Sequence, residues 1–562
     1  MHPYQRNGIV SYFSSNLALL ADGILVGRYV GVNGLAAIGL CTPVILTINL
    51  IGAFLACGAE TLCSRALGMN DGEQAQRIYG AQLSLSLVFS VLFMAVGLFL
   101  MPPIARALSG NDATLIPFVT DYSQVYLLAA IANIMTFPPF WFLPLDGKNT
   151  SVTAMMLIMG IGNILLDIWF LWGLGMGVRG AALASVLSAG ASALFGMIRL
   201  HSGRHCFSLR LALPKGSEWR DLAVAGSPEA NNNLLQVLRV LTINAIFLQT
   251  GGNAMVAQYA VVSSMTAISE AVTMGVPQSG TAILGVYCGE KDNPSALILL
   301  RQQLRVGLIG CAVMALLLGL GTPVIGWAYQ VTGLSVPMWM LSLSLFPVLV
   351  LNILVGYYRV AGREMLANIL IALRVYCFCV LSLLALMAAG ASLWPFQVVE
   401  ALLTLLAWVG LTKAIHRREK EKNVSRWLLM DMSLEDGGNS INFSSPADTQ
   451  SICDASERIG TFCAANQMAP KQTMRVSLAL EEMMTLITQF NSEQSLSFDI
   501  RVFAVHGVIG IRIRYGGIDF NPLDSKYEDD ERFMGIQMVR RLVETTVYQS
   551  TFAVNSLLIL IE

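Results

Sequence analysis

The sequence predicts an all-α polytopic membrane protein, with twelve transmembrane helices in two six-helix lobes, followed by a C-terminal α/β cytoplasmic domain. The 562-residue chain is 55% hydrophobic and only 13% charged, whereas about a quarter of the residues in a soluble domain are charged. Apolar runs of about 20 residues or more recur from about residue 8 to residue 416 and then stop. From residue 424 onward, polar residues return at ordinary frequency, as expected of a soluble domain.

Each predicted span is long enough to cross a hydrocarbon core of about 30 Å. The twelve spans are 8–30, 34–60, 80–104, 117–143, 152–173, 179–201, 223–249, 254–286, 300–328, 336–358, 365–389 and 393–415.

Basic residues gather in alternate connections between these spans. Because positive charge favours cytoplasmic loops, both termini and the C-terminal domain are expected in the cytoplasm, below the plasma membrane. The basic connections follow the even-numbered spans and contain Arg65 and Arg77, Lys148, residues 199–220, Lys291 and Arg301, Arg359 and Arg363, and KAIHRREKEK.

An internal repeat relates the two halves of the membrane part. Gly68, Asp71 and Ala75 match Gly289, Asp292 and Ala296 at one constant offset, and Gly31 and Ala36 match Gly252 and Ala257 at the same offset. Gly147-Lys148 and Gly362-Arg363 form another pair at a slightly shorter offset. Six helices separate the copies, so the pattern predicts a parallel repeat, typical of transporters. The lobes are assigned to residues 1–210 and 211–416.

Polar side chains inside the first lobe predict a site for a coupling ion. Asp22 lies in LLADGILVG, and Asn163 and Asp167 lie in NILLDIWFLWG. Residues four apart share one helix face. A carboxylate at bilayer depth costs several kcal/mol unless water, a cation or a polar partner accompanies it. Ile243 is the repeat match of Asp22, so the acidic site is expected in the first lobe alone.

Simpler interpretations stay open for the same residues. Asp22 could cap a broken helix or line a water channel, and Asn163 could be an interhelical hydrogen-bonding residue. Glu229 is a weak candidate for substrate binding, because an anion near a helix N-terminus needs no functional reason. Glu60, Glu270 and Glu400 also fall in or near spans, where Arg239 and Arg374 could pair with acids.

Several functional classes find no support in the sequence. No basic tract suggests nucleic acid, and the ten Cys show no CxxC or zinc spacing. No GxxxxGK[ST] loop suggests an ATP-driven pump. We expect no enzymatic activity, no cofactor, and no metal site beyond Na⁺ at Asp22, Asn163 and Asp167. The short first apolar stretch suggests that the start lacks a few residues.

Three motifs resemble the multidrug and toxic compound extrusion (MATE) family over residues 10–415: DGILVGRYVGVNGLAAIGL, SRALGMNDGEQAQRIYG and NILLDIWFLWGLGMGVRGAALASVLS. The resemblance implies a monomeric antiporter in membrane lipid that exports small organic, mainly cationic, molecules in exchange for Na⁺ or H⁺. It implies a coupling site at Asp22, Asn163, Asp167 and Ser185, where Ser185 keeps the hydroxyl of the more usual Thr. Ser185 could equally be a small packing residue.

After a charged linker, 417–439, residues 440–562 predict an α/β domain. The predicted elements are a strand at INF, helices at 450–466 and 470–490, a hairpin turning at His506-Gly507, a helix at FMGIQMVRRLVE and a strand at SLLILI.

This order resembles the anti-sigma-factor serine kinase branch of the GHKL ATPases. The resemblance implies a nucleotide site at Glu482, Gly517 and Gly535. However, Leu486 replaces the expected Mg²⁺-binding Asn, and Tyr515 replaces the adenine-binding Asp. The domain is therefore expected to be catalytically inactive, and either a regulatory module that binds a soluble protein or a passive appendage.

Two other functions remain open for the whole chain. A lipid-linked oligosaccharide flippase shares the twelve-helix layout, but would line its cavity with Arg, whereas here the intramembrane charges read as mainly acidic and in one lobe. A membrane sensor that signals through the C-terminal domain would co-purify with a soluble regulator and show no transport.

Overall fold

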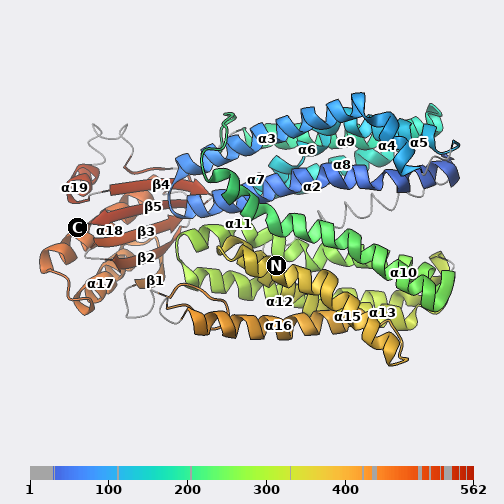
Figure 1. Ribbon diagram of the computed structural model, residues 1–562. Helices are drawn as coiled ribbons and strands as arrows, with labels where there is room; N and C mark the ends of the chain where they lie inside the picture. The colour runs from blue at the N-terminus through green and yellow to red at the C-terminus, as the bar shows by residue number, and fades with distance from the viewer. Residues whose placement is uncertain are drawn as a thin grey trace. The chain divides into compact units, whose positions relative to one another are not determined.

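The computed structural model of this protein describes residues 29–30, 32–109, 113–202, 206–329, 331–419, 423–432, 440–491, 496–505, 508–518, 520–523, 534–543, 545–551 and 554–561 (Figure 1). It divides into two compact units, Met1–Leu411 and Thr412–Glu562. The first is the membrane unit and the second is the C-terminal unit.

Every regular element among the described residues of the membrane unit is a helix, and the helices form two bundles (Figure 1). The first lobe contains α2 (Val32–Gly68), α3 (Gly72–Phe99), α4 (Met101–Leu108), α5 (Ile116–Leu128), α6 (Ala130–Ile134), α7 (Phe137–Leu145), α8 (Asn149–Asp167), the π-helix η1 (Ile168–Gly173) and α9 (Gly177–Leu200). The second contains α10 (Glu218–Thr273), α11 (Gly275–Gly289), α12 (Asn293–Tyr329), α13 (Ser335–Val360), α14 (Glu364–Ala372), the π-helix η2 (Leu373–Cys377), α15 (Phe378–Ala388) and α16 (Phe396–Arg418).

The structure supports part of the predicted set of spans. Among the described residues, nine helices are long and apolar enough to cross a membrane. The pair Ile116–Leu128 and Ala130–Leu145, bent by 58°, passes the same test when it is taken together and is either a broken span or a re-entrant loop. The predicted span 8–30 lies outside the described residues. The predicted span 254–286 is not one helix, because the chain breaks at Met274 between α10 and α11. Twelve spans therefore stay a prediction.

The predicted boundary between spans seven and eight is a break inside α10. Gly252 has φ 62° and ψ −159°, outside the helical region. Glycine adopts positive φ without the steric penalty that a Cβ imposes. Helix therefore continues on both sides of Gly252, and the break changes its direction.

Glycines let the two lobes touch backbone to backbone. A Cβ on Gly68 of α2 would overlap the carbonyl oxygen of Val286 and lie 2.8 Å from the Cα of Gly289, both in α11. A Cβ on Gly285 would lie 2.7 Å from Cβ of Ser64. Gly68 and Gly289 are one matched pair of the repeat, and Ser64 and Gly285 are another at the same offset. Repeat-equivalent positions thus meet each other, as expected where a pseudo-two-fold axis passes between the lobes.

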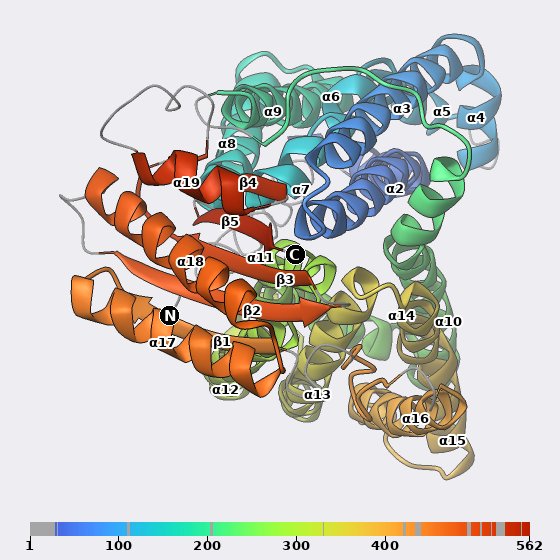
Figure 2. The same ribbon diagram turned by 90° about the vertical axis from the view of Figure 1, so that its left-hand side faces the viewer.

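The C-terminal unit is a five-stranded antiparallel sheet with helices packed on it. Its elements are β1 (Ser440–Pro446), α17 (Thr449–Ala465), α18 (Pro470–Phe490), β2 (Ser497–Val505), β3 (Val508–Tyr515), α19 (Met534–Leu542), β4 (Thr545–Thr551) and β5 (Val554–Ile561). The strand order is β1-β2-β3-β5-β4, and every adjacent pair is antiparallel. Figure 2 shows α17 and α18 lying across one face of the sheet.

Alternation along the strands builds the core of this unit. Phe498, Ile500 and Val502 of β2 are fully buried, and the matching alternate residues of β3 and β5 join them in one apolar cluster with α17 and α18. Successive strand residues face opposite sides of a sheet. The period-two pattern of LSFDIRVFAV therefore specifies the covered face.

Local hydrogen bonds begin the first helix of this unit. Asp448 caps α17 by accepting from Oγ of Ser451 at 2.7 Å and from the backbone N–H of Ser451 at 2.9 Å. These bonds stabilise the carboxylate and hold the pKa of Asp448 below its usual value.

Most predicted elements of the C-terminal unit are confirmed, and one strand was missed. The helices at 450–466 and 470–490 correspond to α17 and α18, and the paired strands correspond to β2 and β3. His506-Gly507 lies outside the described residues. β4 has the sequence TTVYQST and pairs with β5. Its polar composition concealed it, because an edge strand needs no continuous apolar face.

Gly68→Ala tests the contact between the lobes. The added Cβ meets backbone atoms, which cannot rotate away, so overpacking is expected to cost about 1–3 kcal/mol and to lower the melting temperature of the purified protein in detergent. Gly39→Ala is the matched control on the same helix, since a Cβ there meets nothing within 4 Å. Equal melting temperatures for the two variants would contradict the close-contact interpretation.

Leu486→Asn tests whether position 486 belongs to the core of the C-terminal unit. Leu486 is 4% exposed within the apolar cluster, so a buried amide there should reduce the free energy of unfolding by about 2–4 kcal/mol. The measurement is urea unfolding of the isolated C-terminal unit. Gln489→Ala, at an exposed position of the same helix, should change stability little. A stable Leu486→Asn variant would show that this position is free to hold a polar ligand.

Candidate ion and substrate sites

The structure brings together two of the predicted ion-coupling residues. Nδ2 of Asn163 on α8 donates to Oγ of Ser185 on α9 at 3.3 Å. Asn163 is 9% exposed and Asp167 is fully buried. Asp167 lies one helical turn from Asn163 on α8, so the two residues share a face. Asp22 lies outside the described residues, and its place in this site stays a prediction.

The helix geometry changes from α to π at the end of α8, beside this site. Asp167 is its last α-helical residue, and the π-helix η1 follows at once. Single π-helical turns frequently occur at functional sites, because the extra residue per turn displaces side chains and frees carbonyl groups. Gly175 and Gly177 then adopt φ of 62° and 60°, which turns the chain into α9. This tight turn places Ser185 beside Asn163.

A second group of charges lies between the lobes. Arg359 of α13 stands 3.9 Å from a carboxylate oxygen of Glu60 on α2 and 3.9 Å from one of Glu229 on α10. Its guanidinium also lies 5.0 Å from the ring centroid of Trp141 on α7. Glu60, Arg359 and Trp141 are 1%, 5% and 6% exposed. We call these four residues the interlobe cluster.

Arg359 requires a correction to the sequence interpretation. Its sequence context predicts a basic loop, but it is the penultimate residue of α13 and its side chain is buried. A buried guanidinium needs nearby carboxylates, because burying an uncompensated charge is costly. Glu229, the weak substrate candidate, is one of those carboxylates and also accepts from Nδ2 of Asn233 at 3.5 Å. The sequence placed Glu229 near a helix N-terminus, but α10 begins at Glu218, so Glu229 lies about three turns inside the helix and depends on these side chains instead.

An ion pair joins the lobes beside this cluster. Arg65 of α2 contacts Glu364 of α14 at 2.5 Å, and its Nε donates to the carbonyl of Val360 at 2.7 Å. A second donor of Arg65 binds the carbonyl of Arg359. Two of its acceptors are carbonyls at the C-terminal end of α13, where a cation is favourable. The lobes are thus tied at the end of the bundle that carries residues 69–71, 290–292 and 361–363.

Polar side chains also line the contact between α10 and α14. Nδ2 of Asn231 donates to the carbonyl of Asn368 at 3.1 Å, and Nδ2 of Asn368 donates to Oγ of Ser227 at 2.7 Å. Asn231, the first residue of NNN, and Asn368 thus hold two helices of the second lobe together. Interhelical hydrogen bonds of this kind commonly stabilise helix packing in membrane bundles.

Buried charge is not confined to the first lobe, which corrects a second interpretation. Arg239 of α10 pairs with Glu400 of α16 at 2.7 Å, as the sequence had allowed. Together with Arg359, the second lobe holds basic and acidic groups side by side. The idea that intramembrane charges are mainly acidic and in one lobe is therefore wrong for the part of the chain that the structure describes.

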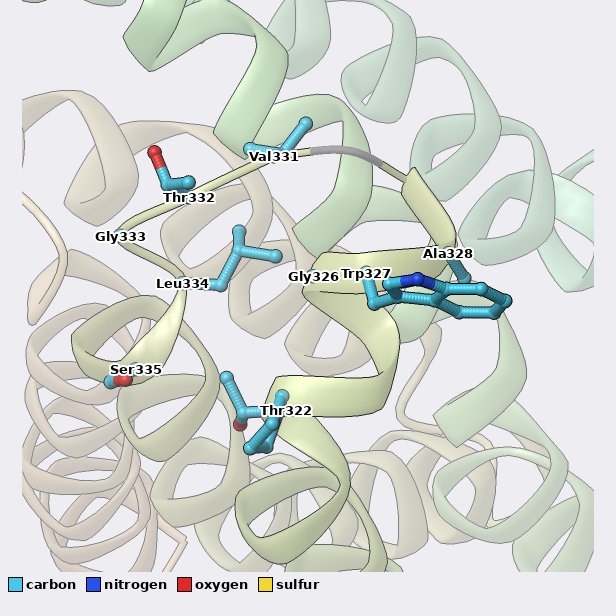
Figure 3. Close-up of a pocket in the computed structure, with 10 residues that line it drawn as sticks. Thr322, Gly326, Trp327, Ala328, Val331, Thr332, Gly333, Leu334 and Ser335 are labelled. Carbon is cyan, nitrogen blue, oxygen red and sulfur yellow. The ribbon is translucent and has the colours of Figure 1, made fainter.

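A pocket of the second lobe lies apart from these sites. Figure 3 shows a pocket of about 800 Å³ between the end of α12 and the start of α13, lined by Thr322, Pro323, Gly326–Ala328 and Val331–Ser335. It contains no charged side chain, and Trp327 is 82% exposed. An exposed indole at a helix end is typical of a membrane interface. None of the predicted site residues lines this pocket.

In the C-terminal unit, the replaced ligand positions are filled by core residues. Leu486 and Tyr515 are 4% and 1% exposed, and the hydroxyl of Tyr515 donates to the carbonyl of Phe520. Phe520 stacks on Phe490 with ring centroids 3.9 Å apart. Glu482 lies partly buried on α18.

The two predicted glycines lie on different elements of this unit. Gly517 adopts φ 97° in the turn after β3, where only glycine fits easily. Gly535 lies in the first turn of α19. Whether these residues form a nucleotide site stays a prediction.

Comparison with known proteins supports the membrane assignment. The family profile named MatE matches residues 9–172. The chain is 27% identical over 247 residues to a multidrug export protein, MepA, of Staphylococcus haemolyticus, covering 43% of this chain and 54% of that protein. It is 24% identical over 311 residues to a probable multidrug resistance protein, YoeA, of Bacillus subtilis, covering 53% and 65%. The matches thus span about half to two thirds of these curated relatives.

A solved structure shares the fold of the membrane unit. A multidrug resistance MATE family transporter in an outward-facing conformation superimposes with a TM-score of 0.67 at 21% identity, over 72% of this chain and 92% of that one. At this identity the likeness shows the fold alone. The profile match over residues 9–172 and this shared fold agree with the predicted resemblance of the membrane unit to the MATE family.

Proposed function

We propose that this protein is an antiporter that exports organic, mainly cationic, compounds across the plasma membrane in exchange for Na⁺ or H⁺. The observation that carries the proposal is the fully buried Asp167, one turn from an Asn163 that donates to Ser185. Carboxylate, amide and hydroxyl oxygens are hard ligands suited to Na⁺, and a buried carboxylate also suits a proton. Asp22 would complete this set from the first span.

The interlobe cluster supports a cationic substrate. Glu60 and Glu229 provide negative charge from different lobes, and Trp141 provides an aromatic face. Aromatic faces and carboxylates are the two groups that recognise organic cations. Arg359 occupies this position in the structure, so a cationic substrate would compete with its guanidinium for the same acids. The names of the relatives, a multidrug export protein and a probable multidrug resistance protein, agree with such a substrate.

The charge distribution supports an orientation. The end of the bundle closed by Arg65 and Glu364 carries the basic connections, so we place it in the cytoplasm. The described conformation then has its lobes tied at the cytoplasmic side. Binding of an ion to the first lobe would bias the packing of that lobe, and a bias between two packings is what couples a gradient to alternating access.

The arginines do not favour a flippase. A pyrophosphate group would need guanidinium groups free to bind it, whereas Arg239 and Arg359 each face carboxylates of this chain.

For the C-terminal unit we propose a regulatory role without catalysis. Leu486 and Tyr515 occupy the places of the expected metal and adenine ligands, and both belong to its apolar core. A soluble regulatory protein is the expected partner of this unit.

Export driven by separately imposed gradients tests the proposal. In proteoliposomes loaded with a fluorescent organic cation, a Na⁺ or a pH gradient should drive efflux. Asp22→Asn and Asp167→Asn should each abolish the gradient-driven component, because each removes a negative charge from the site. Asn163→Ala should weaken the apparent ion affinity by about ten-fold or less, the equivalent of one neutral hydrogen bond of about 1 kcal/mol.

Asp121→Asn is the matched control for these variants. Asp121 lies in the same lobe, but its side chain is 33% exposed and pairs with Arg179 at 2.8 Å. Coupling should survive its neutralisation. Wild-type efflux in Asp167→Asn, or loss of coupling in Asp121→Asn alone, would remove the basis for this assignment.

The C-terminal unit makes a separate prediction. Residues 424–562 expressed alone should fold, since they hold an apolar core of their own, but should not hydrolyse ATP. Titration calorimetry with Mg-ATP should show weak or absent binding. Backbone N–H groups can bind phosphate, but they supply no ligand for Mg²⁺. Deleting the unit should leave basal export intact. Micromolar, Mg²⁺-dependent binding with turnover would instead identify an active nucleotide site.

A further inference from the structure

The second lobe contains a buried ion pair in a polar site. Nη2 of Arg239 contacts Oε1 of Glu400 at 2.7 Å, and the side chains are 13% and 3% exposed. Nη1 of Arg239 also donates to the carbonyl of Val375 at 3.3 Å. The Phe396 ring centroid lies 5.7 Å from the guanidinium carbon. Arg239, on α10, is therefore held by two other helical elements, η2 and α16.

Four further titratable groups surround this pair. Tyr259 and Cys379 lie close enough to interact electrostatically with Arg239, and Cys379 and Arg374 with Glu400. Arg374 is also close enough to interact electrostatically with Glu270. Two arginines and two glutamates thus balance each other, and the lobe contains no excess charge here among the described groups.

The helices that make this site are the repeat counterparts of those that make the ion site of the first lobe. Arg239 lies on the first span of its lobe, one helical turn from Ile243, which is the repeat match of Asp22. The fifth span begins after Gly147-Lys148 in one lobe and after Gly362-Arg363 in the other, and each copy contains a π-helical turn at its site, η1 or η2. Ser185 and Glu400 lie on the sixth spans.

We propose that Arg239 is a built-in cation. Its guanidinium takes the place in the second lobe that a coupling cation takes in the first, so the second lobe is permanently loaded and only the first responds to the ion. The comparison with the first lobe rests on the proposed function. The claim about the second lobe is independent of it: without Arg239, the remaining carboxylates form a latent site for a monovalent cation.

Charge and geometry both support this inference. A carboxylate buried in a membrane helix must be neutralised by a nearby cation or by a proton. In the described lobe, Arg239 supplies that charge through a short, charge-assisted contact. Removing it leaves Glu400 and Glu270 with Arg374 as the one remaining cation among the groups named above, an excess of one negative charge that Na⁺ or a proton can balance.

The test is the melting temperature of the full-length protein in detergent, measured against Na⁺ concentration, with choline as the replacement, and against pH. All variants carry Asp167→Asn, so that the first lobe contributes no ion response. The parent should show no response to Na⁺, and its own pH profile, to which groups such as Asp448 contribute, is the baseline for the variants. Arg239→Met should melt lower, and Na⁺ or acidic pH should restore its melting temperature in a saturable way. Arg239→Met with Glu400→Gln should lose that response.

Two outcomes would overturn the inference. One is an Arg239→Met variant whose melting temperature ignores both Na⁺ and pH. The other is a response that persists after Glu400→Gln, which would place the cation elsewhere. If Arg239→Met does not accumulate, Arg239→Lys still decides the question. It keeps the positive charge, so its melting temperature must not respond to Na⁺ and must follow the pH profile of the parent; any other response would contradict the role of charge. Failure of the proposed function would appear in the efflux assay and not in these melts.

Discussion

Compensation of buried charge is the constraint on which the membrane unit depends. Bilayer lipid supplies no partner for a carboxylate or a guanidinium, so each one must find opposite charge or hydrogen bonds inside the protein. Arg239 with Glu400, Arg359 with Glu60 and Glu229, and Arg65 with Glu364 follow this rule. These contacts join helices that are far apart in the sequence, and they therefore determine which helices pack together.

The three groups of charge differ in what they hold together. Arg239 and Glu400 lie within the second lobe, and Arg65 and Glu364 join one lobe to the other. Arg359 stands at equal distance from an acid of each lobe. Arg359 makes two long contacts of 3.9 Å, which are weaker than one short, charge-assisted contact. Of the three arginines, Arg359 is therefore the one that another cation can displace most easily from its carboxylates.

Sequence patterns anticipated features that depend on local spacing. The four-residue interval between Asn163 and Asp167 predicted a shared face, and the alternation in β2 and β3 predicted a hairpin. Features that depend on tertiary contact were missed. Arg359 is followed closely by Ala361-Gly362 and reads as a loop cation, and only the acids on α2 and α10 show why it is buried.

The C-terminal unit shows the same difference between local features, which the sequence predicts, and tertiary contacts, which it does not. The resemblance predicted lost ligands at Leu486 and Tyr515, whereas the burial of both side chains in the core could not be predicted from the sequence. The break at Met274 was missed as well, because the apolar run continues through it unchanged. Conversely, the constant offset between the two copies of the repeat was visible at once. That its matching glycines touch each other required the folded chain.

The contact of Gly68 with Gly289 has a mechanical consequence. It lies at one extremity of α2, whose 37 residues extend up to about 55 Å at 1.5 Å per residue. If α2 rotated by about 10° about this contact, its opposite end would move by roughly 10 Å, given that length. The glycine pair thus lies at the pivot of a long helix. A sub-ångström displacement of α2 beside this contact produces a displacement many times larger at the other end of the helix.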